Sequence, residues 1–441
     1  MNPQRFLRLV SGAMAALGIS AAAIVALNLR GEDPLPSAET LKPTPALVAQ
    51  GEYLTRVGNC MACHTVQGGA PFAGGRGIET PFGVVYSSNL TPDKATGLGA
   101  WTSAEFWRAM HNGRGKDGRL LYPAFPYTSY THVTREDSDA IFAYLQSLPP
   151  VAQANKVHAL RFPYSTQAAL GVWRALFFTP ADVAQPAASA PQALATAQVP
   201  DYQRGAYLVN GLGHCAACHT PRNSLGAEQQ GQALAGGLIP VQNWLAPALT
   251  DAGQAGVQRW PQADVVALLK TGVAPQASVI GPMAEVVFRS TQYLSDADAR
   301  AMAVYLQALP QHAATPAKQA AAPASVMERG AKVYEAQCAQ CHGAQGQGAK
   351  DEAGQPAFPP LAGNRAVVLA DPTNLVRVVL QGGYLPATAG NPRPHGMPPF
   401  QHLLGDEDVA AVTTFVRNSW GNQAAGVGTI EVYRARERRS P

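Results

Sequence analysis

All six cysteines of this 441-residue chain belong to one motif, Cys-x-x-Cys-His, which occurs three times. The copies are Cys60–His64, Cys215–His219 and Cys338–His342. Residues three apart on a helical turn lie on one face, so the two thiols of each copy point the same way. No cysteine is left over for a disulfide or a free thiol. We therefore expect the chain to fold as three similar units, each built around one motif.

Cys-x-x-Cys-His is the attachment sequence of c-type haem. The two thiols bond the porphyrin, and the histidine that follows binds the iron as proximal ligand. A structural zinc site needs about four ligands, and each motif supplies three without a consistent fourth. A thioredoxin-like redox pair needs one βαβ context, not three tandem copies. We predict three covalently bound haem c groups, held by Cys60, Cys63, Cys215, Cys218, Cys338 and Cys341, with His64, His219 and His342 on the irons.

Each motif lies inside a longer repeat. A short helix candidate containing glycine precedes the motif, and an apolar helix with an acidic start closes the repeat. The closing helices are expected at 137–148, 296–309 and 406–420, where apolar residues recur every three or four positions. Asp in the first turn of each suits the helix dipole. The pattern predicts a mainly α-helical protein with three tandem cytochrome c-like domains and long loops.

The expected domain boundaries follow changes in composition. Residues 1–44 are an N-terminal anchor or signal with a linker, and 426–441 are a basic tail that we expect to be solvated. Ala/Pro-rich stretches typical of spacers separate the domains, the first of them beginning with a possible helix at Thr166–Phe178. The domains are predicted at 45–150, 199–310 and 325–425, with the linkers at 151–198 and 311–324.

A sixth iron ligand usually lies downstream of the motif in such domains, and a methionine there raises the reduction potential. The candidates are Met283, in Gly-Pro-Met, and Met397, in Gly-Met-Pro-Pro. A methionine can also act as a soft filler of a core. Because both residues stand beside proline in loops, we expect them to be the ligands of the second and third haems.

The first domain departs from this pattern. Phe125 occupies the place where a methionine is expected, and phenylalanine cannot coordinate iron. Three residues could replace it: Met110, His111 and His132. A histidine or methionine on an apolar face is more often packing, so an open or water-bound site is the remaining alternative. A haem without methionine would have a distinct potential.

The N-terminus carries 21 uncharged residues, Leu9–Leu29, enough to span a bilayer as a helix. Arg5 and Arg8 precede this stretch, so the N-terminus is expected in the cytoplasm and the rest of the chain in the periplasm. A cleaved signal peptide is the alternative. The apolar run continues beyond the small residues at 21–23, which favours an uncleaved anchor in the inner membrane.

Charge and motif content exclude other functions. The net charge is +4, but the first thirty residues and the last eleven supply more than all of it. The remaining chain has no basic surplus to follow a phosphate backbone, which argues against nucleic acid. Neither a dinucleotide fingerprint nor a hydrolase or zinc-protease motif is present. We therefore expect no catalytic residues in the protein outside the haem groups.

Several stretches of sequence, two of which overlap a motif, resemble the tri-haem cytochrome c subunits of membrane-bound bacterial dehydrogenases. Those dehydrogenases act on alcohol, gluconate, sorbitol or aldehyde. The strings lie at 58–65, 71–75, 78–83, 88–93, 218–223, 397–400 and 416–422. The resemblance implies electron transfer from a catalytic subunit through three haems to the quinone pool or a terminal acceptor. Alcohol and gluconate members carry methionine where Phe125 stands, and the string at 122–127 is more similar to the cytochromes of molybdenum hydroxylases.

The predicted function is therefore electron transfer as the non-catalytic subunit of a dehydrogenase. The expected partners are a catalytic subunit (molybdenum hydroxylase, quinoprotein or flavoprotein), the inner membrane, and a quinone or terminal oxidase as acceptor. Three alternatives remain: a peroxidase-like haem enzyme that uses an open first haem, a chain in which one domain serves only for docking, and a direct donor to a terminal oxidase.

Overall fold

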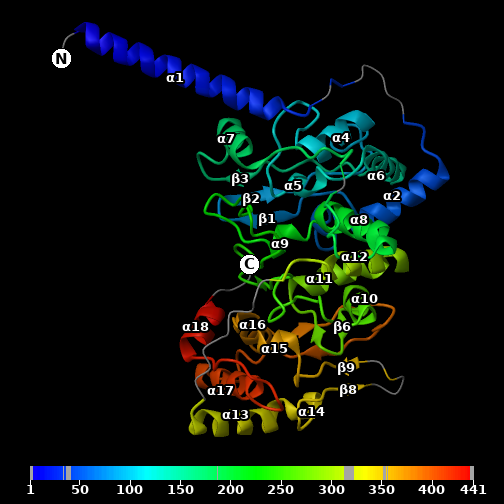
Figure 1. Cartoon of the computed structure of the whole chain (residues 1–441), viewed down its shortest axis with the longest axis vertical. Coiled ribbons are helices and arrows are strands. Elements are labelled where there is room, and N and C mark those ends of the chain that lie inside the picture. Colours follow the sequence, from blue (N-terminus) through cyan, green and yellow to red (C-terminus); the bar gives the residue numbers. More distant parts are fainter. Residues whose placement is uncertain are drawn as a thin grey trace. The chain divides into compact units, whose positions relative to one another are not determined.

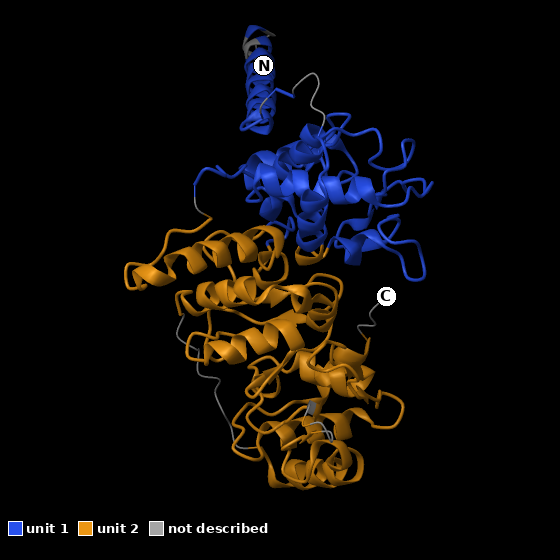
Figure 2. Cartoon of the chain, turned by 90° about the vertical axis from the view of Figure 1, so that its right-hand side faces the viewer, with its two compact units in different colours: residues 1–55, 60–185, 223–227 blue, residues 56–59, 186–222, 228–441 orange. Residues whose placement is uncertain are grey.

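The computed structural model of the chain describes residues 3–32, 34–35, 41–185, 187–311, 322–350, 354 and 356–437. They form two compact units, coloured separately in Figure 2. Unit 1 comprises residues 1–55, 60–185 and 223–227, and unit 2 comprises residues 56–59, 186–222 and 228–441. Most of the expected linker at 311–324 lies outside the described residues, as do Arg438 and Arg439 of the tail.

Unit 1 holds the N-terminal helix, the first motif and a small sheet (Figure 1). Its helices are α1 (Pro3–Leu29), most of α2 (Pro45–Val57), α3 (Cys60–His64), α4 (Ser103–Asn112), α5 (Tyr127–Tyr130), α6 (Arg135–Ser147) and α7 (Gln167–Phe177). Its strands are β1 (Gly77–Thr80), β2 (Gly83–Tyr86) and β3 (Ala159–Leu160). The strands pair antiparallel in the order β1-β2-β3.

Unit 2 holds the second and third motifs and is also mainly helical. Its helices are α8 (Val199–Tyr207), α9 (Ala216–His219), α10 (Gln262–Thr271), α11 (Pro282–Arg289), α12 (Asp296–Gln307), α13 (Ala324–Gln337), α14 (Ala339–His342), α15 (Arg365–Val368), α16 (Thr373–Gln381), α17 (Asp406–Arg417) and α18 (Thr429–Glu437). Short 3₁₀ or π turns cover Thr196–Gln198, Leu208–Leu212 and Thr291–Tyr293.

The strands of unit 2 are short and form antiparallel pairs, each with its neighbour in the chain. The pairs are β4 (Gly237–Leu238) with β5 (Leu245–Ala246), β6 (Val273–Ala274) with β7 (Ala277–Ser278), β8 (Ala349–Lys350) with β9 (Pro356–Phe358), and β10 (Gly383–Tyr384) with β11 (Gly396–Met397). These short pairs lie in the loops that connect the helices. The helices therefore supply the core of unit 2.

In every repeat, the helix before the motif crosses the closing helix at a glycine. The crossing pairs are α2 with α6, α8 with α12, and α13 with α17. A Cβ atom at Gly51, Gly205 or Gly330 would lie 1.9, 2.0 or 2.3 Å from the backbone oxygen of Ala140, Ala301 or Ala411, respectively. Because glycine has no Cβ, it alone permits this close approach of two helices. The same packing therefore recurs three times along the chain.

The three closing helices begin and end within three residues of their predicted limits. The side chain of Thr134 accepts a hydrogen bond from the backbone of Asp137 at the start of α6, and Ser295 caps α12 in the same way. Helix α17 instead begins with three acidic residues, which the helix dipole favours. Caps and charges that are visible in the sequence therefore set these boundaries.

Two segments expected to lie outside the domains have ordered structure. Within the linker at 151–198, β3 extends the sheet of unit 1, and α7 begins after its cap residue Thr166, close to the possible helix at Thr166–Phe178. In the tail, α18 packs against α16 and α17 through Val432 and Ala435, which are both buried. The apolar side of α18 explains why this part of the tail is packed rather than solvated.

Helix α1 contains a segment, Leu9–Leu29, that is long and apolar enough to cross a bilayer, with a mean hydropathy of 2.1. Its C-terminal end is joined to the rest of unit 1. Glu32 pairs with Arg114 at 2.5 Å, and the Asn112 side chain donates to the carbonyl of Gly31 at 2.9 Å. Asn28 also contacts α7. The chain just after the apolar segment is therefore part of the packed structure of unit 1.

Candidate haem sites

Each Cys-x-x-Cys-His motif forms a short helical turn, which follows the opening helix closely in the first and third repeats and comes after the π turn Leu208–Leu212 in the second. The turns are α3, α9 and α14, and the last two begin immediately after Cys215 and Cys338. This conformation places the two cysteines of a motif on one face, as the spacing predicts. The histidine that ends each turn follows the second cysteine directly.

The histidine of each motif is held by the same kind of backbone contact. The Nδ1 atom of His64 lies 2.7 Å from the carbonyl of Ser88, that of His219 lies 2.7 Å from Pro247, and that of His342 lies 3.1 Å from Pro359. When Nδ1–H donates to a carbonyl, Nε2 has its lone pair available for a metal. The three imidazoles are therefore oriented alike and suited to bind iron through Nε2.

The loop that follows each motif histidine makes the same backbone hydrogen bond in all three repeats. The backbone oxygens of His64, His219 and His342 accept from the amides of Gly74, Gly236 and Gly348 at 2.7–2.8 Å, and all three glycines have positive φ. Because a left-handed conformation suits glycine, these positions carry a sequence signal. The carbonyl partners Ser88, Pro247 and Pro359 each stand two residues before a leucine. Sequence analysis missed these acceptors, and that recurring leucine is the signal that could have located them.

The first thiol of each motif is buried, and this makes it difficult to ionise. Burial raises the pKa of Cys60 and Cys215 to about 12, and it raises that of Cys338 to about 11. A catalytic thiol requires a lowered pKa, because the thiolate is the nucleophile. Within the part of the chain that the structure describes, no cluster of three or more His, Cys, Asp and Glu side chains could hold a metal ion on its own.

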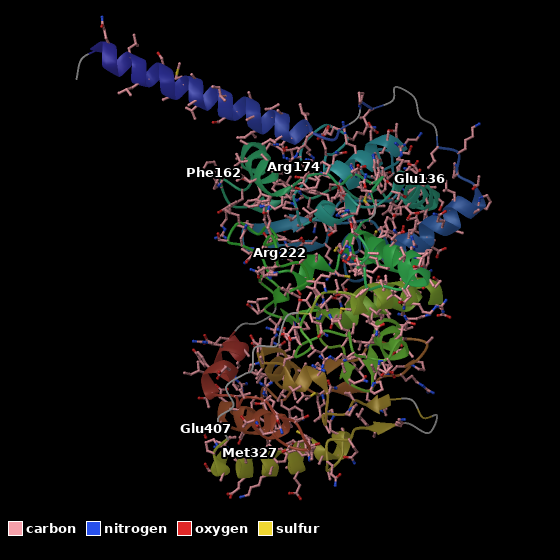
Figure 3. All side chains as sticks on the ribbon, in the orientation of Figure 1. Glu136, Phe162, Arg174, Arg222, Met327 and Glu407 are labelled. Atoms are coloured by element: carbon pink, nitrogen blue, oxygen red, sulfur yellow. The ribbon has the colours of Figure 1, made fainter. Side chains whose placement is uncertain are left out.

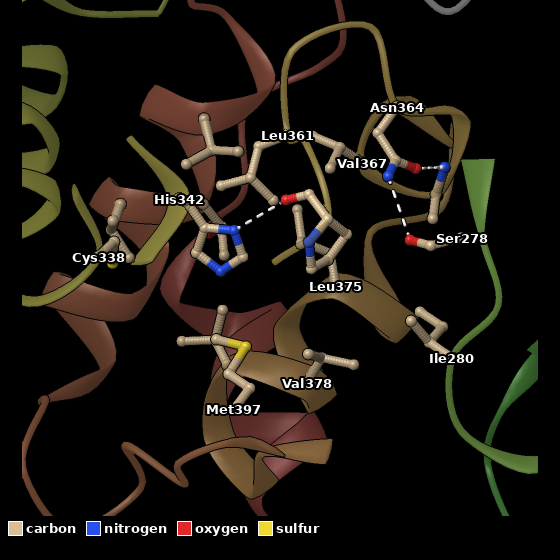
Figure 4. A pocket seen from close by; sticks show the side chains of 16 residues that line it. Ser278, Ile280, Cys338, His342, Leu361, Asn364, Val367, Leu375, Val378 and Met397 are labelled. Atoms are coloured by element: carbon tan, nitrogen blue, oxygen red, sulfur yellow. Dashed lines mark hydrogen bonds between the residues drawn. The ribbon is translucent and has the colours of Figure 1, made fainter. Parts of the chain in front are cut away.

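The third repeat encloses a cavity lined by three of its four predicted site residues, all but Cys341 (Figure 4). Cys338, His342 and Met397 all line it, and the Met397 side chain points toward the His342 ring. Most of the other lining side chains are aliphatic, among them Leu375 and Val416. An imidazole, a thioether and a thiol around an apolar space are the kinds of group that hold a c-type haem. The residues present therefore fit the group.

The wall of this cavity includes two residues of the second repeat, Ser278 and Ile280. Asn364 of the third repeat donates to the Ser278 hydroxyl at 3.2 Å, and the amide of Arg365 donates to the carbonyl of Gln276 at 2.8 Å. Ile280 stands three residues before Met283, the second residue of α11. The segment that ends in the predicted ligand of the second haem therefore helps to enclose the site of the third.

The two repeats are also joined on the side of α16. The guanidinium of Arg377, which is fully buried, lies 4.7 Å from the centre of the Trp244 ring. The Asn374 side chain makes two hydrogen bonds with the backbone of Leu245, at 2.8 and 2.9 Å. These buried contacts hold the second and third repeats together within unit 2.

The first repeat has its own arrangement. The Phe125 ring packs 5.4 Å from the ring of Tyr130. Burial raises the pKa of Tyr130 well above its usual value, and the neighbouring Cys60 and Cys63 raise it further. Phe125 therefore packs against a buried tyrosine whose pKa is affected by the two cysteines of this motif.

The three candidates for the sixth ligand of the first haem occupy different environments. Met110 is buried on α4, and His111 stacks on the Trp107 ring with 4.5 Å between ring centres. His132 is half-buried in the turn after α5, and burial lowers its pKa. The packing of Met110 and His111 resembles that of core residues. The choice among these residues and an open site stays a prediction.

Comparison with known proteins also indicates a c-type cytochrome. The cytochrome c family model matches three segments, residues 48–149, 202–310 and 327–420. The chain is 39% identical to the alcohol dehydrogenase (quinone) cytochrome c subunit of Gluconacetobacter polyoxogenes, over 92% of this chain and 87% of that one. It is 40% identical to the gluconate 2-dehydrogenase cytochrome c subunit of Pantoea cypripedii, over 88% of each. A nicotinate dehydrogenase subunit of Pseudomonas putida is also 40% identical, over 85% of this chain and 30% of that protein.

Proposed function

Because the chain belongs to the cytochrome c family, and within it to the cytochrome c subunits of bacterial dehydrogenases, we propose that it carries electrons from a dehydrogenase catalytic subunit to the next acceptor through three covalently bound haem c groups. The observation that carries this proposal is the threefold recurrence of one histidine arrangement. Each motif histidine directs Nδ1 to a backbone carbonyl and has Nε2 available for iron.

The three haem domains are proposed to lie in tandem at 45–150, 199–310 and 325–425. The glycine crossings and the repeated loops behind the histidines support this division. When bound, each haem supplies a one-electron redox centre. The chain would hold the rings through the six motif cysteines and would present the imidazoles of His64, His219 and His342 to the irons, and the aliphatic wall of the third cavity would exclude water there. Met397 would complete the third site and Met283 the second.

The residues proposed to hold the second and third haems are linked by one short segment. Ile280 contributes to the wall of the third cavity, and Met283 follows three residues later. Three residues span at most about 11 Å even when fully extended. The buried contacts around Asn364 and Arg377 keep this separation fixed. If Met283 binds the second iron, the residues that would hold the second and third haems therefore share one short stretch of chain, which would favour direct exchange between them.

The protein is proposed to be anchored in the inner membrane by α1, with its haem domains in the periplasm. An uncleaved helix is supported by the contacts of Asn28, Gly31 and Glu32 with unit 1. Cleavage near residue 31 would remove Asn28 and the hydrogen bonds that it makes. The partner would be a molybdenum hydroxylase, a quinoprotein or a flavoprotein, and the acceptor a quinone or a terminal oxidase.

Phe125 favours the molybdenum hydroxylases among these partners, because it stands where the alcohol and gluconate types carry methionine. Affinity capture of the chain from native membranes, followed by metal and cofactor analysis, tests this choice. Molybdenum together with a large co-purifying subunit is the expected result. A quinoprotein or flavoprotein partner without molybdenum would assign the chain to the other types.

The haem assignment is tested on the purified chain. A pyridine haemochrome assay should give three haems per chain, and spectroelectrochemistry should resolve three reversible steps. Met283→Ala and Met397→Ala should each alter the spectrum and the potential of one haem. Met327→Ala is the matched control, because Met327 lies on α13, away from the motif. Fewer than three haems would refute the proposal.

A further inference from the structure

Arg377 on α16 places a positive charge in the interior of unit 2. The side chain is fully buried, and its Nη2 atom donates to the Gln381 side chain at 3.3 Å. Water and salt screen charges at the surface, whereas the field of a buried charge acts on its surroundings with little screening. The groups around this guanidinium are therefore the ones whose charge state it influences most.

On one side, Arg377 belongs to the wall of the proposed third haem site. Leu375 and Val378 of α16 line the cavity together with His342 and Met397 (Figure 4). Arg377 stands between those two aliphatic residues in the helix. The charge is therefore carried by the same helix that helps to enclose both proposed ligands of the third iron.

On the other side, the guanidinium contacts the second repeat. Its carbon atom lies 4.7 Å from the centre of the Trp244 ring, a cation–π contact that is strongest when water is excluded. The Asn374 side chain, one turn earlier on α16, makes two hydrogen bonds with the backbone of Leu245, at 2.8 and 2.9 Å. These contacts hold the charge against the second repeat.

Trp244 in turn adjoins the segments that carry both proposed ligands of the second haem. A Cβ atom at Gly281 would lie 2.8 Å from three atoms of the indole ring, so the ring lies directly against Gly281, two residues before Met283. Strand β5 begins next to Trp244 and leads to Pro247, whose carbonyl lies 2.7 Å from the Nδ1 atom of His219. One aromatic ring therefore connects the guanidinium to the surroundings of the second site.

We propose that the charge of Arg377 raises the reduction potentials of the second and third haems together. A nearby positive charge favours the reduced form of a haem, because that form carries one positive charge fewer than the oxidised form. Because one charge acts on both centres, it moves both potentials in the same direction. The inference deepens the proposed function and rests on it, since it requires the second and third haems at the sites assigned to them.

The test measures the reduction potentials of the full chain in detergent by spectroelectrochemistry. Arg377→Met removes the charge and retains most of the side-chain volume, whereas Arg377→Lys retains the charge. The variants Met283→Ala and Met397→Ala identify which of the measured potentials belong to the second and the third haem.

Arg174→Met is the matched control. Arg174 is also a buried arginine, but it lies on α7 of unit 1, where its Nε atom donates to the Asn28 side-chain oxygen at 3.0 Å (Figure 3). Loss of its charge should leave the potentials of the second and third haems unchanged. The control therefore separates the position of the charge from the general effect of removing a buried arginine.

The expected effect follows from Coulomb's law. Two unit charges about 12 Å apart, at an effective dielectric constant of about 20, change an equilibrium constant about tenfold. We therefore expect Arg377→Met to lower the equilibrium constant for reduction of both haems several-fold, and a tenfold change corresponds to about 59 mV for one electron. Arg377→Lys should keep both potentials close to those of the unsubstituted chain.

Unchanged potentials in Arg377→Met, or a change confined to one of the two haems, would overturn the inference. Equal changes in Arg377→Met and Arg377→Lys would also overturn it, because they would reflect packing and not charge. If Arg377→Met does not retain three haems, Arg377→Gln, which is neutral but can still form hydrogen bonds, is measured against the same criteria. Fewer than three haems in the unsubstituted chain would instead refute the proposed function, and with it this inference.

Discussion

The glycine crossing in the third repeat leads to a quantitative prediction, the effect of Gly330→Ala. A Cβ at this position would meet the Ala411 oxygen at 2.3 Å, the Ala411 carbonyl carbon at 2.8 Å and the Phe415 Cβ at 2.6 Å, whereas ordinary contact begins near 3.4 Å. The first two atoms belong to backbone and cannot rotate away. Helices α13 and α17 must therefore separate by about 1 Å, which forfeits a quarter to a half of the dispersion energy of each contact between them.

The expected magnitude combines two opposing effects. Overpacking of a core costs about 1–3 kcal/mol, and an obstruction by backbone belongs at the upper end of that range. Replacing glycine by alanine within a helix returns about 1 kcal/mol. We therefore expect Gly330→Ala to lower the free energy of unfolding by about 2 kcal/mol. Because α17 supplies Val412 and Val416 to the cavity wall, the absorption band of methionine-bound haem should also weaken for one haem.

The assay is denaturant unfolding of the purified chain in detergent, followed by the haem absorbance. Gly171→Ala is the matched control, since it also adds a methyl group within a helix, but its nearest neighbour lies at 3.7 Å. The control should be neutral or slightly stabilising. An unfolding midpoint for Gly330→Ala at or above that of the unsubstituted chain would refute the argument that α13 and α17 cross at this glycine.

Three further predictions follow from the contacts described above. Met397→His should keep the third haem six-coordinate and lower the potential of that haem alone, because methionine raises the potential; three unchanged potentials in spectroelectrochemistry would contradict the ligand assignment. Arg174→Met should lower the unfolding free energy of unit 1 by about 1–3 kcal/mol, because it leaves the buried Asn28 oxygen without its donor; an unchanged denaturant midpoint would argue against this contact. Hydrogen bonds from Thr96 hold the pKa of Asp93 below its usual value, so the ionised carboxylate stabilises the fold above the unfolded-state pKa and this contribution is lost as the pH falls through the lower folded-state pKa. The stability advantage of the unsubstituted chain over Asp93→Asn should therefore disappear in acid, and an advantage that stays constant with pH would contradict it.

The local chemistry of the three motifs could be predicted because it is contained within five residues. Spacing alone places two thiols and one imidazole on a helical turn, and it needs no knowledge of the rest of the chain. The closing helices were predictable for a similar reason, since their acidic starts and apolar periodicity are local. The carbonyls that accept from the histidine Nδ1 atoms could not be predicted in this way, because Ser88, Pro247 and Pro359 lie 17 to 28 residues further along the chain. A backbone carbonyl has no side-chain signal of its own, so only the leucine that recurs two residues later could have located these acceptors.

The sequence by itself determined the class of protein, the position of each motif and the presence of an apolar N-terminal helix. Only the tertiary structure decided which faces are covered. Periodicity indicated a helix near Thr166–Phe178, but it could not tell that Arg174 turns inward, because the partner Asn28 stands 146 residues earlier. It likewise could not show that Ile280 of the second repeat helps to enclose the site of the third. Side-chain chemistry is local, whereas burial depends on which distant segments the folded chain brings into contact.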